Sequence, residues 1–183
     1  MRILESKKLV LKPVEEEDLQ FLLDLRWDRD TMDYLIHYPI SYKSQQQWLE
    51  NIRKSGDMPL SIFVKENDEL KIAGTVGLYE FDYRHQRANW RLRVSQTYRR
   101  KGIGFESTYL MLDYGFNTLN INKIVSDSFA DNIAIVKLSK KLGFIEEGVL
   151  RRHYFHHGSF RDVIAFGLFR EDFNKKNLIN NFI

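Results

Sequence analysis

Residues 88–119 read ANWRLRVSQTYRRKGIGFESTYLMLDYGFNTL and decide the fold of this chain. They predict a strand over 88–94, in which apolar and polar residues alternate, a short basic loop over 95–104 and a long helix over 105–119. A strand that passes through a short loop into a long helix is one unit of an α/β architecture, because the helix packs on the sheet that the strand joins.

The loop in this stretch has the composition of an anion site. Gly102 and Gly104 lie where a helix begins, and the first backbone N–H groups of a helix have no intrahelical partner and lie at the positive end of its dipole. Glycine permits positive φ angles and a close backbone approach. Arg99, Arg100 and Lys101 add three cations. These features favour a phosphate, although the loop taken alone is equally compatible with an ordinary turn.

A second motif gives this loop its context. The segment 99–104, RRKGIG, fits the pattern (Gln/Arg)-x-x-Gly-x-(Gly/Ala), and the run 131–144, DNIAIVKLSKKLGF, follows about 30 residues later. In this order the two motifs resemble the acetyl-CoA-binding core of the GNAT N-acetyltransferase superfamily. The resemblance covers nearly the whole chain. It is closest to the subgroup that holds ribosomal-protein alanine acetyltransferases and bacterial spermidine acetyltransferases.

Length and composition indicate one domain over residues 1–183. Hydrophobic residues make up 43% of the chain and aromatic residues 14%, which is ample for a core, and no linker rich in proline, glycine or serine divides it. The absence of cysteine excludes disulfides, thiolate nucleophiles and cysteine-ligated metals. No apolar run has the pattern of a signal peptide or a membrane span, so we expect a cytoplasmic protein without a membrane partner.

The charge balance gives little support to a nucleic-acid partner. The net charge is only +3, the pI is about 9.0, and the strongest basic cluster already has an explanation as a phosphate site. No recognition-helix pattern or aromatic RNA-binding strand accompanies that cluster. His156 and His157 fall in a predicted exposed turn and not on a zinc-binding helix, so we expect no metal site.

The other segments complete a predicted α/β order. Strands are expected over 8–13, 60–64, 71–81, 88–94 and 123–129 and in a final hairpin closed near 157–159; helices are expected from residue 15, over 44–54, after the glycine loop, and from residue 131 or 132 to Gly143. If the helix after residue 104 is a crossover, strands 88–94 and 123–129 are parallel. The order predicts an α/β sandwich: a mixed, mostly antiparallel sheet with a parallel central pair, flanked by helices, as in the resembled family.

The resemblance implies direct attack of a neutral amine on the thioester of acetyl-CoA, without a covalent enzyme intermediate. The family binds the pyrophosphate on the loop backbone and polarises the thioester oxygen with a main-chain N–H near the end of the central strand, here at Arg93 or Val94. Asn132 is expected to begin the next helix and to contact the pantetheine arm. The residues expected to hold acetyl-CoA are therefore Leu92, Arg93, Val94, Arg99, Arg100, Lys101, Gly102, Ile103, Gly104 and Asn132.

The first two predicted helices form one wall of the acceptor pocket in the resembled family. The aromatic-rich segment between them makes Tyr34, His37, Tyr38 and Tyr42 candidate substrate contacts, although the same side chains would also suit packing over the sheet. Asn89, a further candidate, occupies the position where spermidine-type relatives carry a glutamate. An asparagine is neither a base nor an anion, which argues mildly against a polyamine. The expected acceptor is a small-molecule amine or a protein amino group.

Proton transfer has two candidate catalytic residues. Ser139 occupies the position where many relatives place a tyrosine that protonates the departing CoA thiolate, and a serine hydroxyl can hydrogen-bond the sulfur. Glu80, on the strand before the central one, is the candidate base if its side chain points to the cleft; the alternative is an outward-facing carboxylate. Other possible proton acceptors are water and the histidines His85, His153, His156 and His157.

We therefore expect an acetyl-CoA-dependent N-acetyltransferase. The alternative is a non-catalytic acyl-CoA-binding regulatory protein that kept the cofactor site and lost the usual proton relay, which the residues Asn89 and Ser139 allow. The C-terminal strands commonly mediate dimers in such folds, so a homodimer is a further expectation.

Overall fold

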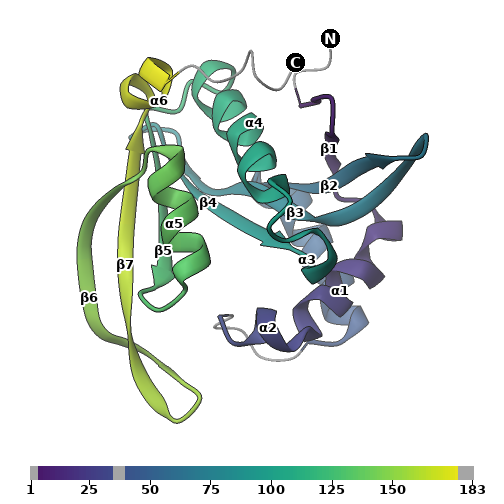
Figure 1. Cartoon of the computed structure of the whole chain (residues 1–183), viewed down its shortest axis with the longest axis horizontal. Coiled ribbons are helices and arrows are strands. Elements are labelled where there is room, and N and C mark those ends of the chain that lie inside the picture. Colours follow the sequence, from purple (N-terminus) through teal and green to yellow (C-terminus); the bar gives the residue numbers. More distant parts are fainter. Residues whose placement is uncertain (1–3, 35–39, 177–183) are drawn as a thin grey trace.

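The computed structural model describes residues 4–34 and 40–176. A seven-stranded sheet has the strand order β1-β2-β3-β4-β5-β7-β6 (Figure 1). The strands are β1 (Leu9–Pro13), β2 (Met58–Glu66), β3 (Glu69–Asp82), β4 (Arg87–Val94), β5 (Lys123–Phe129), β6 (Ile145–His156) and β7 (Ser159–Phe169). The helices are α1 (Leu19–Trp27), α2 (Arg29–Met32), α3 (Tyr42–Ser55), α4 (Ile103–Asn117), α5 (Ile133–Leu142) and α6 (Arg170–Lys176), with the 3-10 turns η1 (Glu16–Asp18) and η2 (Gln96–Tyr98).

The sheet is antiparallel except at its centre, where β4 and β5 run parallel, which confirms the predicted fold class. α4 is the crossover between these two strands. Their pairing is short and comprises Arg87 with Lys123, Ala88 with Ile124 and Asn89 with Val125. Because β4 continues to Val94 and β5 to Phe129, the two strands separate beyond Asn89 and the sheet opens there.

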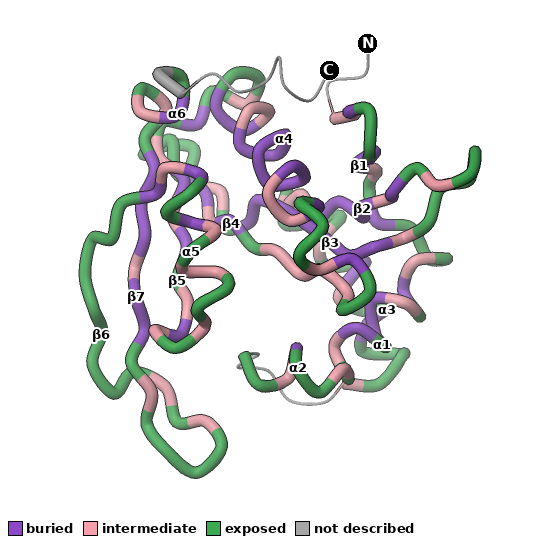
Figure 2. Tube along the Cα trace, viewed as in Figure 1, coloured by how far each residue is buried: buried purple, intermediate pink, exposed green. Residues whose placement is uncertain are grey.

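α4 lies across one face of the sheet and is buried along most of its length (Figure 2). Gly115 allows this close contact, because a Cβ there would lie 2.7 Å from Leu78 Cδ1 on β3 and 3.2 Å from Ile124 Cδ1 on β5. α5 covers the neighbouring part of the same face (Figure 1). Trp90 of β4 stacks on Phe144, the second residue after α5, with 5.4 Å between ring centroids.

α1 and α3 lie on the opposite face of the sheet (Figure 1). They contact one another through a smaller apolar cluster of Val14, Leu19, Leu22 and Leu49, with Phe21 and Trp48 against it. Ser41 begins α3 by accepting a hydrogen bond from the Ser44 amide at 3.2 Å. Since successive side chains of a strand point to opposite faces, alternate residues of β4 face α4 and α1.

Two elements differ from the sequence-based prediction. β3 continues to Asp82 through a register shift after Tyr79, which places Glu80 at φ 55°. α6 was not predicted, because Phe173 is its one apolar residue and no periodic pattern marks the segment. The Phe173 ring packs in the core, and its centroid lies 4.8 Å from that of Tyr109 and 5.2 Å from that of Phe116. Within the described residues, no helix combines the length and the apolar character needed to cross a bilayer.

Candidate active site

The glycine loop between β4 and α4 presents free backbone donors at a helix start. Gly102 is the N-cap residue of α4 with φ 84°, and Arg100 also has a positive φ of 61°. Among the described residues, no group accepts a hydrogen bond from the backbone N–H groups of residues 100–104. Five successive donors at the positive end of a helix form a site for an anion. The exposed side chains of Arg100 and Lys101 add positive charge there.

The two glycines of this loop have different physical roles. Gly102 needs its positive φ, whereas a Cβ there would meet nothing within 4 Å, so the backbone conformation alone favours glycine. Gly104 lies within α4, and a Cβ there would lie 3.2 Å from Leu92 Cδ2 and 3.8 Å from Leu138 Cδ2. The predicted positive φ therefore applies to Gly102, while Gly104 lets α4 begin close to β4 and α5.

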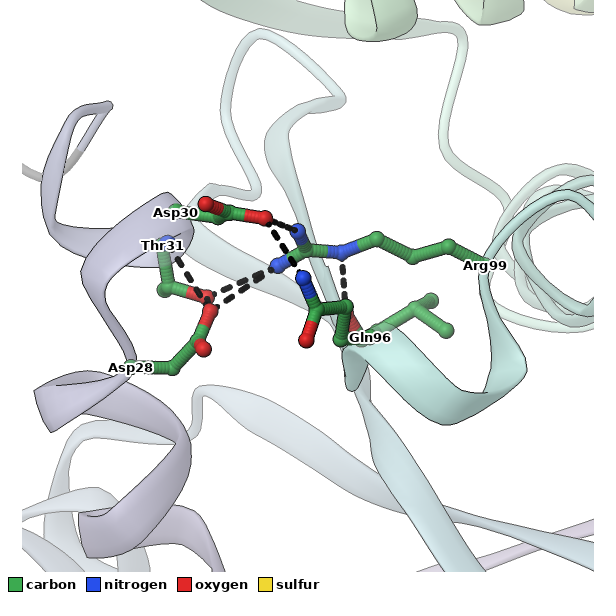
Figure 3. Close-up of polar contacts among 6 residues, drawn as sticks. Asp28, Asp30, Thr31, Gln96 and Arg99 are labelled. Carbon is green, nitrogen blue, oxygen red and sulfur yellow. Dashed lines mark hydrogen bonds and ion pairs between the residues drawn. The ribbon is translucent and has the colours of Figure 1, made fainter.

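The Arg99 side chain binds the loop to α2 through hydrogen bonds and ion pairs (Figure 3). Its Nη2 donates to Thr31 Oγ1 at 2.9 Å and lies 3.4 Å from Asp28 Oδ2, while its Nη1 lies 3.3 Å from Asp30 Oδ2. Its Nε donates to the carbonyl of Val94 at 3.0 Å. The guanidinium is therefore fully engaged within the protein. These contacts give the Arg99 side chain a structural role, and its expected contact with the phosphate stays a prediction.

The part of β4 beyond the β5 contact has one open edge. The Ser95 N–H donates to the Ala73 carbonyl of β3 at 2.8 Å. In an antiparallel pair the backbone groups of successive residues alternate between the two edges, so those of Arg93 point to β3 and those of Val94 point to the open side. Of the two main-chain donors proposed for the thioester oxygen, Val94 is thus the one on the open edge.

α5 contributes a free buried hydroxyl beside the loop. The Asn132 side chain accepts the Ile135 amide at 3.4 Å, which confirms that Asn132 begins this helix. Ser139 is fully buried, and in the part of the chain that the structure describes its Oγ has no hydrogen-bond partner. A buried unpaired hydroxyl is unfavourable. Because Ser139 has no exposed surface, a ligand atom such as a sulfur could contact its Oγ only after the neighbouring side chains move.

The Glu80 carboxylate reaches Asn89 from the neighbouring strand. It accepts a hydrogen bond from Asn89 Nδ2 at 3.4 Å and forms an ion pair with Arg91. The Glu80 side chain is 61% exposed, as the outward-facing alternative predicts. Its contact with Asn89 nevertheless brings a carboxylate to the position where the resemblance expects an acid. The left-handed backbone at Glu80 is uncommon for a residue with a Cβ and holds the side chain in this place.

The hairpin of β6 and β7 contacts the last residue of α2 and the residues that follow it. His156 Nε2 lies 3.2 Å from the Met32 carbonyl, and His157 Nε2 lies 3.4 Å from Asp33 Oδ1. Arg161 lies 5.4 Å from the ring centroid of Tyr34, a predicted acceptor contact that is exposed here. The predicted contacts His37 and Tyr38 lie outside the described residues. No cluster of described residues has the three or more ligands that a metal ion would need.

A basic cluster lies on the face of β4 that α1 covers. Asn89, Arg91 and Arg93 share this face, because Trp90, Leu92 and Val94 alternate with them and face α4 and α5. Burial lowers the pKa of Arg93 to about 10, and the positive charges of Arg26 on α1 and Arg91 contribute. Burial also lowers the pKa of Arg26. Both groups remain cations at neutral pH.

From the sequence, Arg93 is expected only for its main chain, and Arg26 is not among the expected site residues. A signal for Arg26 was present, since it follows Leu22 and Leu23 by four and three residues and so continues the buried stripe of α1. Arg26 and Arg93 are both half-buried, so each guanidinium is only partly removed from water, and a partner or a ligand would offset the remaining cost.

Comparison with known proteins identifies relatives that match most of the chain. A family model described as an acetyltransferase (GNAT) domain matches residues 8–145. The spermidine N(1)-acetyltransferase of Escherichia coli strain K12 is 31% identical over 163 residues, which cover 89% of this chain and 87% of that protein. The uncharacterized N-acetyltransferase p20 of Bacillus licheniformis is 30% identical over 180 residues, which cover 94% of this chain and 99% of that protein.

The fold also matches a solved structure. The crystal structure of spermidine N-acetyltransferase from Vibrio cholerae in complex with CoA and spermine has a TM-score of 0.83 to this chain at 26% identity. The match covers 91% of this chain and 98% of that one.

Proposed function

Because this chain belongs to the GNAT acetyltransferase family and is an N-acetyltransferase with acetyl-CoA as the donor, we propose that it acetylates a primary amine by direct attack within a ternary complex. The observation that carries this proposal is the opening of the sheet beyond Asn89, beside a loop with five amides that have no acceptor among the described residues. The opening connects the face of β4 that carries α4 and α5 with the face that carries α1. Donor and acceptor can therefore approach it from opposite sides.

The residues of the α4 and α5 face fit acetyl-CoA, which supplies an activated acyl group. We assign the pyrophosphate to the amides of residues 100–104 and to the side chains of Arg100 and Lys101. The Val94 N–H, on the open edge of β4, is assigned to the thioester oxygen. The Ser139 Oγ is assigned to the departing thiolate because it is buried and unpaired. A thioester needs no protein nucleophile for aminolysis, which agrees with a chain without cysteine.

Glu80 is the base that we propose for the amine proton. An amine attacks only in its neutral form, so a proton must leave the ammonium group before or during attack. The Glu80 carboxylate contacts Asn89, the last β4 residue paired with β5, and so lies at the start of the opening. It can accept the proton directly or through one water. The ion pair with Arg91 fixes the carboxylate in this position.

Thiol release from acetyl-CoA in the presence of a panel of primary amines tests this proposal. Glu80→Gln is expected to lower kcat on the best acceptor by about 10²-fold, which is typical for loss of a general base. Glu69→Gln, which removes an exposed carboxylate from the same strand, is the matched control and should retain full activity. Tight acetyl-CoA binding without turnover of any amine would instead support the non-catalytic alternative.

The named relatives suggest a polyamine as the first acceptor to include, since the E. coli relative is a spermidine acetyltransferase and the V. cholerae structure contains spermine. The local residues of this chain favour other amines. Asn89 supplies no charge at the position of the expected acid, and the Glu80 carboxylate is already paired with Arg91. The panel should therefore contain neutral and anionic amines beside spermidine.

We further propose that the chain forms a homo-oligomer through β6. This strand is at the edge of the sheet, and nearly every residue along it is exposed (Figure 2). Its backbone edge is free to pair with another strand, and its exposed surface includes Ile145, Val149, Leu150 and Phe155. A long apolar strand edge left in water promotes association, and a second copy of β6 offers a matching edge.

A further inference from the structure

Arg26 of α1 and Arg93 of β4 have no counter-ion among the residues that the structure describes. Among the described residues, neither Arg26 nor Arg93 forms an ion pair or donates a hydrogen bond to a side chain or a carbonyl. The other cations near them differ in this respect, since Arg91 is paired with Glu80 and Arg99 with Asp28 and Asp30.

Two carboxylates lie in this region and keep their charge. Asp18 accepts a hydrogen bond from Ser61 at 2.6 Å, and Asp57, which acts electrostatically on Tyr79, accepts one from the Glu80 amide at 2.7 Å. Among the described residues, neither forms an ion pair with Arg26 or Arg93. The groups that act electrostatically on Arg93 are Arg26, Arg91 and the phenol of Tyr79, and none of them is an anion at neutral pH. Residues 1–3, 35–39 and 177–183, which the structure does not describe, contain no aspartate or glutamate. The sequence therefore holds no undescribed side-chain carboxylate that could neutralise this pair.

The surroundings of Arg93 contain further unused hydrogen-bonding capacity. Thr75 lies directly opposite Arg93 on β3, and its buried Oγ1 has no partner within the described part of the chain. Tyr79, on the same face of β3, is buried, and burial raises its pKa, so its hydroxyl stays protonated and can donate. Unpaired cations, a free hydroxyl and a phenol together form a site that is complementary to an oxyanion.

This site faces the acceptor side of the opening. Arg93 belongs to the part of β4 that has separated from β5, and its side chain points away from α4, where the donor is assigned. Arg26 is contributed by α1, which covers the same face. An amine that attacks from this face would therefore place its remaining groups close to the two guanidinium groups.

We propose that Arg26 and Arg93 bind an oxyanion, a carboxylate or a phosphate, that the amine acceptor itself carries. This inference rests on the proposed function, because it concerns the acceptor of the same reaction. It makes the substrate an anionic amine, such as an amino acid, a peptide with a free carboxylate or a phosphorylated amino sugar. A polyamine would bring additional positive charge to two cations that already lack a counter-ion, and like charges repel.

Turnover of matched acceptors tests the substrate class. Glucosamine 6-phosphate is compared with glucosamine, and a dipeptide with its C-terminal amide, so that the phosphate and carboxylate sources are separated; spermidine is the cationic comparison. The anionic member of at least one pair should have a kcat/KM about tenfold or more above its neutral partner, as expected for a charge-assisted hydrogen bond. Arg26→Gln and Arg93→Gln should raise KM for that acceptor about tenfold and leave KM for acetyl-CoA unchanged.

The matched control is Arg29→Gln, which removes an exposed arginine close to Arg26 in sequence and should leave both KM values unchanged. A higher kcat/KM for spermidine than for every anionic amine, unaffected by Arg26→Gln and Arg93→Gln, would overturn the assignment.

A binding measurement separates this inference from the proposed function. With saturating CoA present to fill the loop of residues 100–104, inorganic phosphate at ten times its Kd should raise the Tm of the wild-type chain by about 4 °C. The double variant Arg26→Gln/Arg93→Gln should lose this shift, and Arg29→Gln should keep it. An equal shift in the double variant refutes the oxyanion site. Loss of the shift in the double variant supports the site even if no amine in the panel is acetylated, a result that would count against the proposed reaction alone.

Discussion

Replacement of Arg99 by alanine is expected to destabilise the protein more than it weakens acetyl-CoA binding. The side chains of Arg99, Asp28 and Asp30 are 34%, 29% and 52% exposed, so water screens the two ion pairs and each contributes roughly 0.5 kcal/mol or less. The hydrogen bonds to Thr31 Oγ1 and to the Val94 carbonyl are shorter, and each contributes about 1 kcal/mol. The free energy of unfolding should therefore fall by roughly 2 kcal/mol.

Thermal unfolding measures this effect. For a chain of this length, a loss of 1 kcal/mol lowers Tm by about 2–4 °C, so Arg99→Ala should lower Tm by about 4–8 °C. Arg100→Ala is the matched control, because the Arg100 side chain is exposed and forms no contact with α2 among the described residues. It should change Tm by no more than about 2 °C.

Acetyl-CoA binding, measured by calorimetry, should show the reverse order. Arg100→Ala removes a cation that faces solvent at the phosphate loop and should weaken binding more than Arg99→Ala does. Arg99→Ala could instead leave Tm unchanged and weaken acetyl-CoA binding more than Arg100→Ala does. The structural role assigned to the Arg99 side chain would then be wrong. Arg99 would then act directly on the phosphate, as the sequence alone suggests.

Three other predictions concern single residues. Gly102→Ala should cost about 1 kcal/mol of stability, since alanine must adopt φ 84°, and should weaken acetyl-CoA binding in calorimetry; unchanged affinity would show that the amides are not used. Ser139→Ala should lower turnover at saturating acetyl-CoA by on the order of 10² without lowering Tm, because the hydroxyl that it removes has no partner in the described structure. Full turnover would assign the thiolate proton to water. Val149→Lys should reduce the molar mass in light scattering to that of one chain, and an unchanged oligomer would exclude the β6 edge as the interface.

The sequence predicts the fold well because its decisive signals are local. The amide cap at Asn132 and the left-handed Gly143, at φ 103°, mark both ends of α5, and the loop before α4 is readable from its glycines and cations. A long helix between two strands then suffices to make β4 and β5 parallel. The bulge at Glu80 is different, because a left-handed glutamate has no local sequence signature and depends on its contacts with Asp57 and Arg91.

The site is predictable to the extent that its backbone forms it. The free amides of residues 100–104 follow from a glycine loop at a helix start, which one short segment encodes. Side-chain partners are encoded elsewhere: Thr31 lies 68 residues before Arg99 along the chain. No spacing rule connects residues so far apart. From sequence alone, a cation in a basic loop is therefore predicted to bind the ligand, and only the structure shows which residues it contacts.

The difference between a site formed by backbone groups and one formed by side chains explains why family membership identifies the acyl donor more firmly than the amine acceptor. A backbone loop binds a phosphate through groups that every residue possesses, so its function needs only the right φ angles at residues such as Gly102. The acceptor face is formed by side chains that different elements bring together, and we propose Arg26 from α1 and Arg93 from β4 for this role. Each substitution there changes charge directly, so a chain about 30% identical to spermidine acetyltransferases can use the same donor and still present a positive acceptor site. Among the described residues Arg26 and Arg93 have no ion-pair partner, and under our proposal their charge favours anionic over cationic amines at the opening.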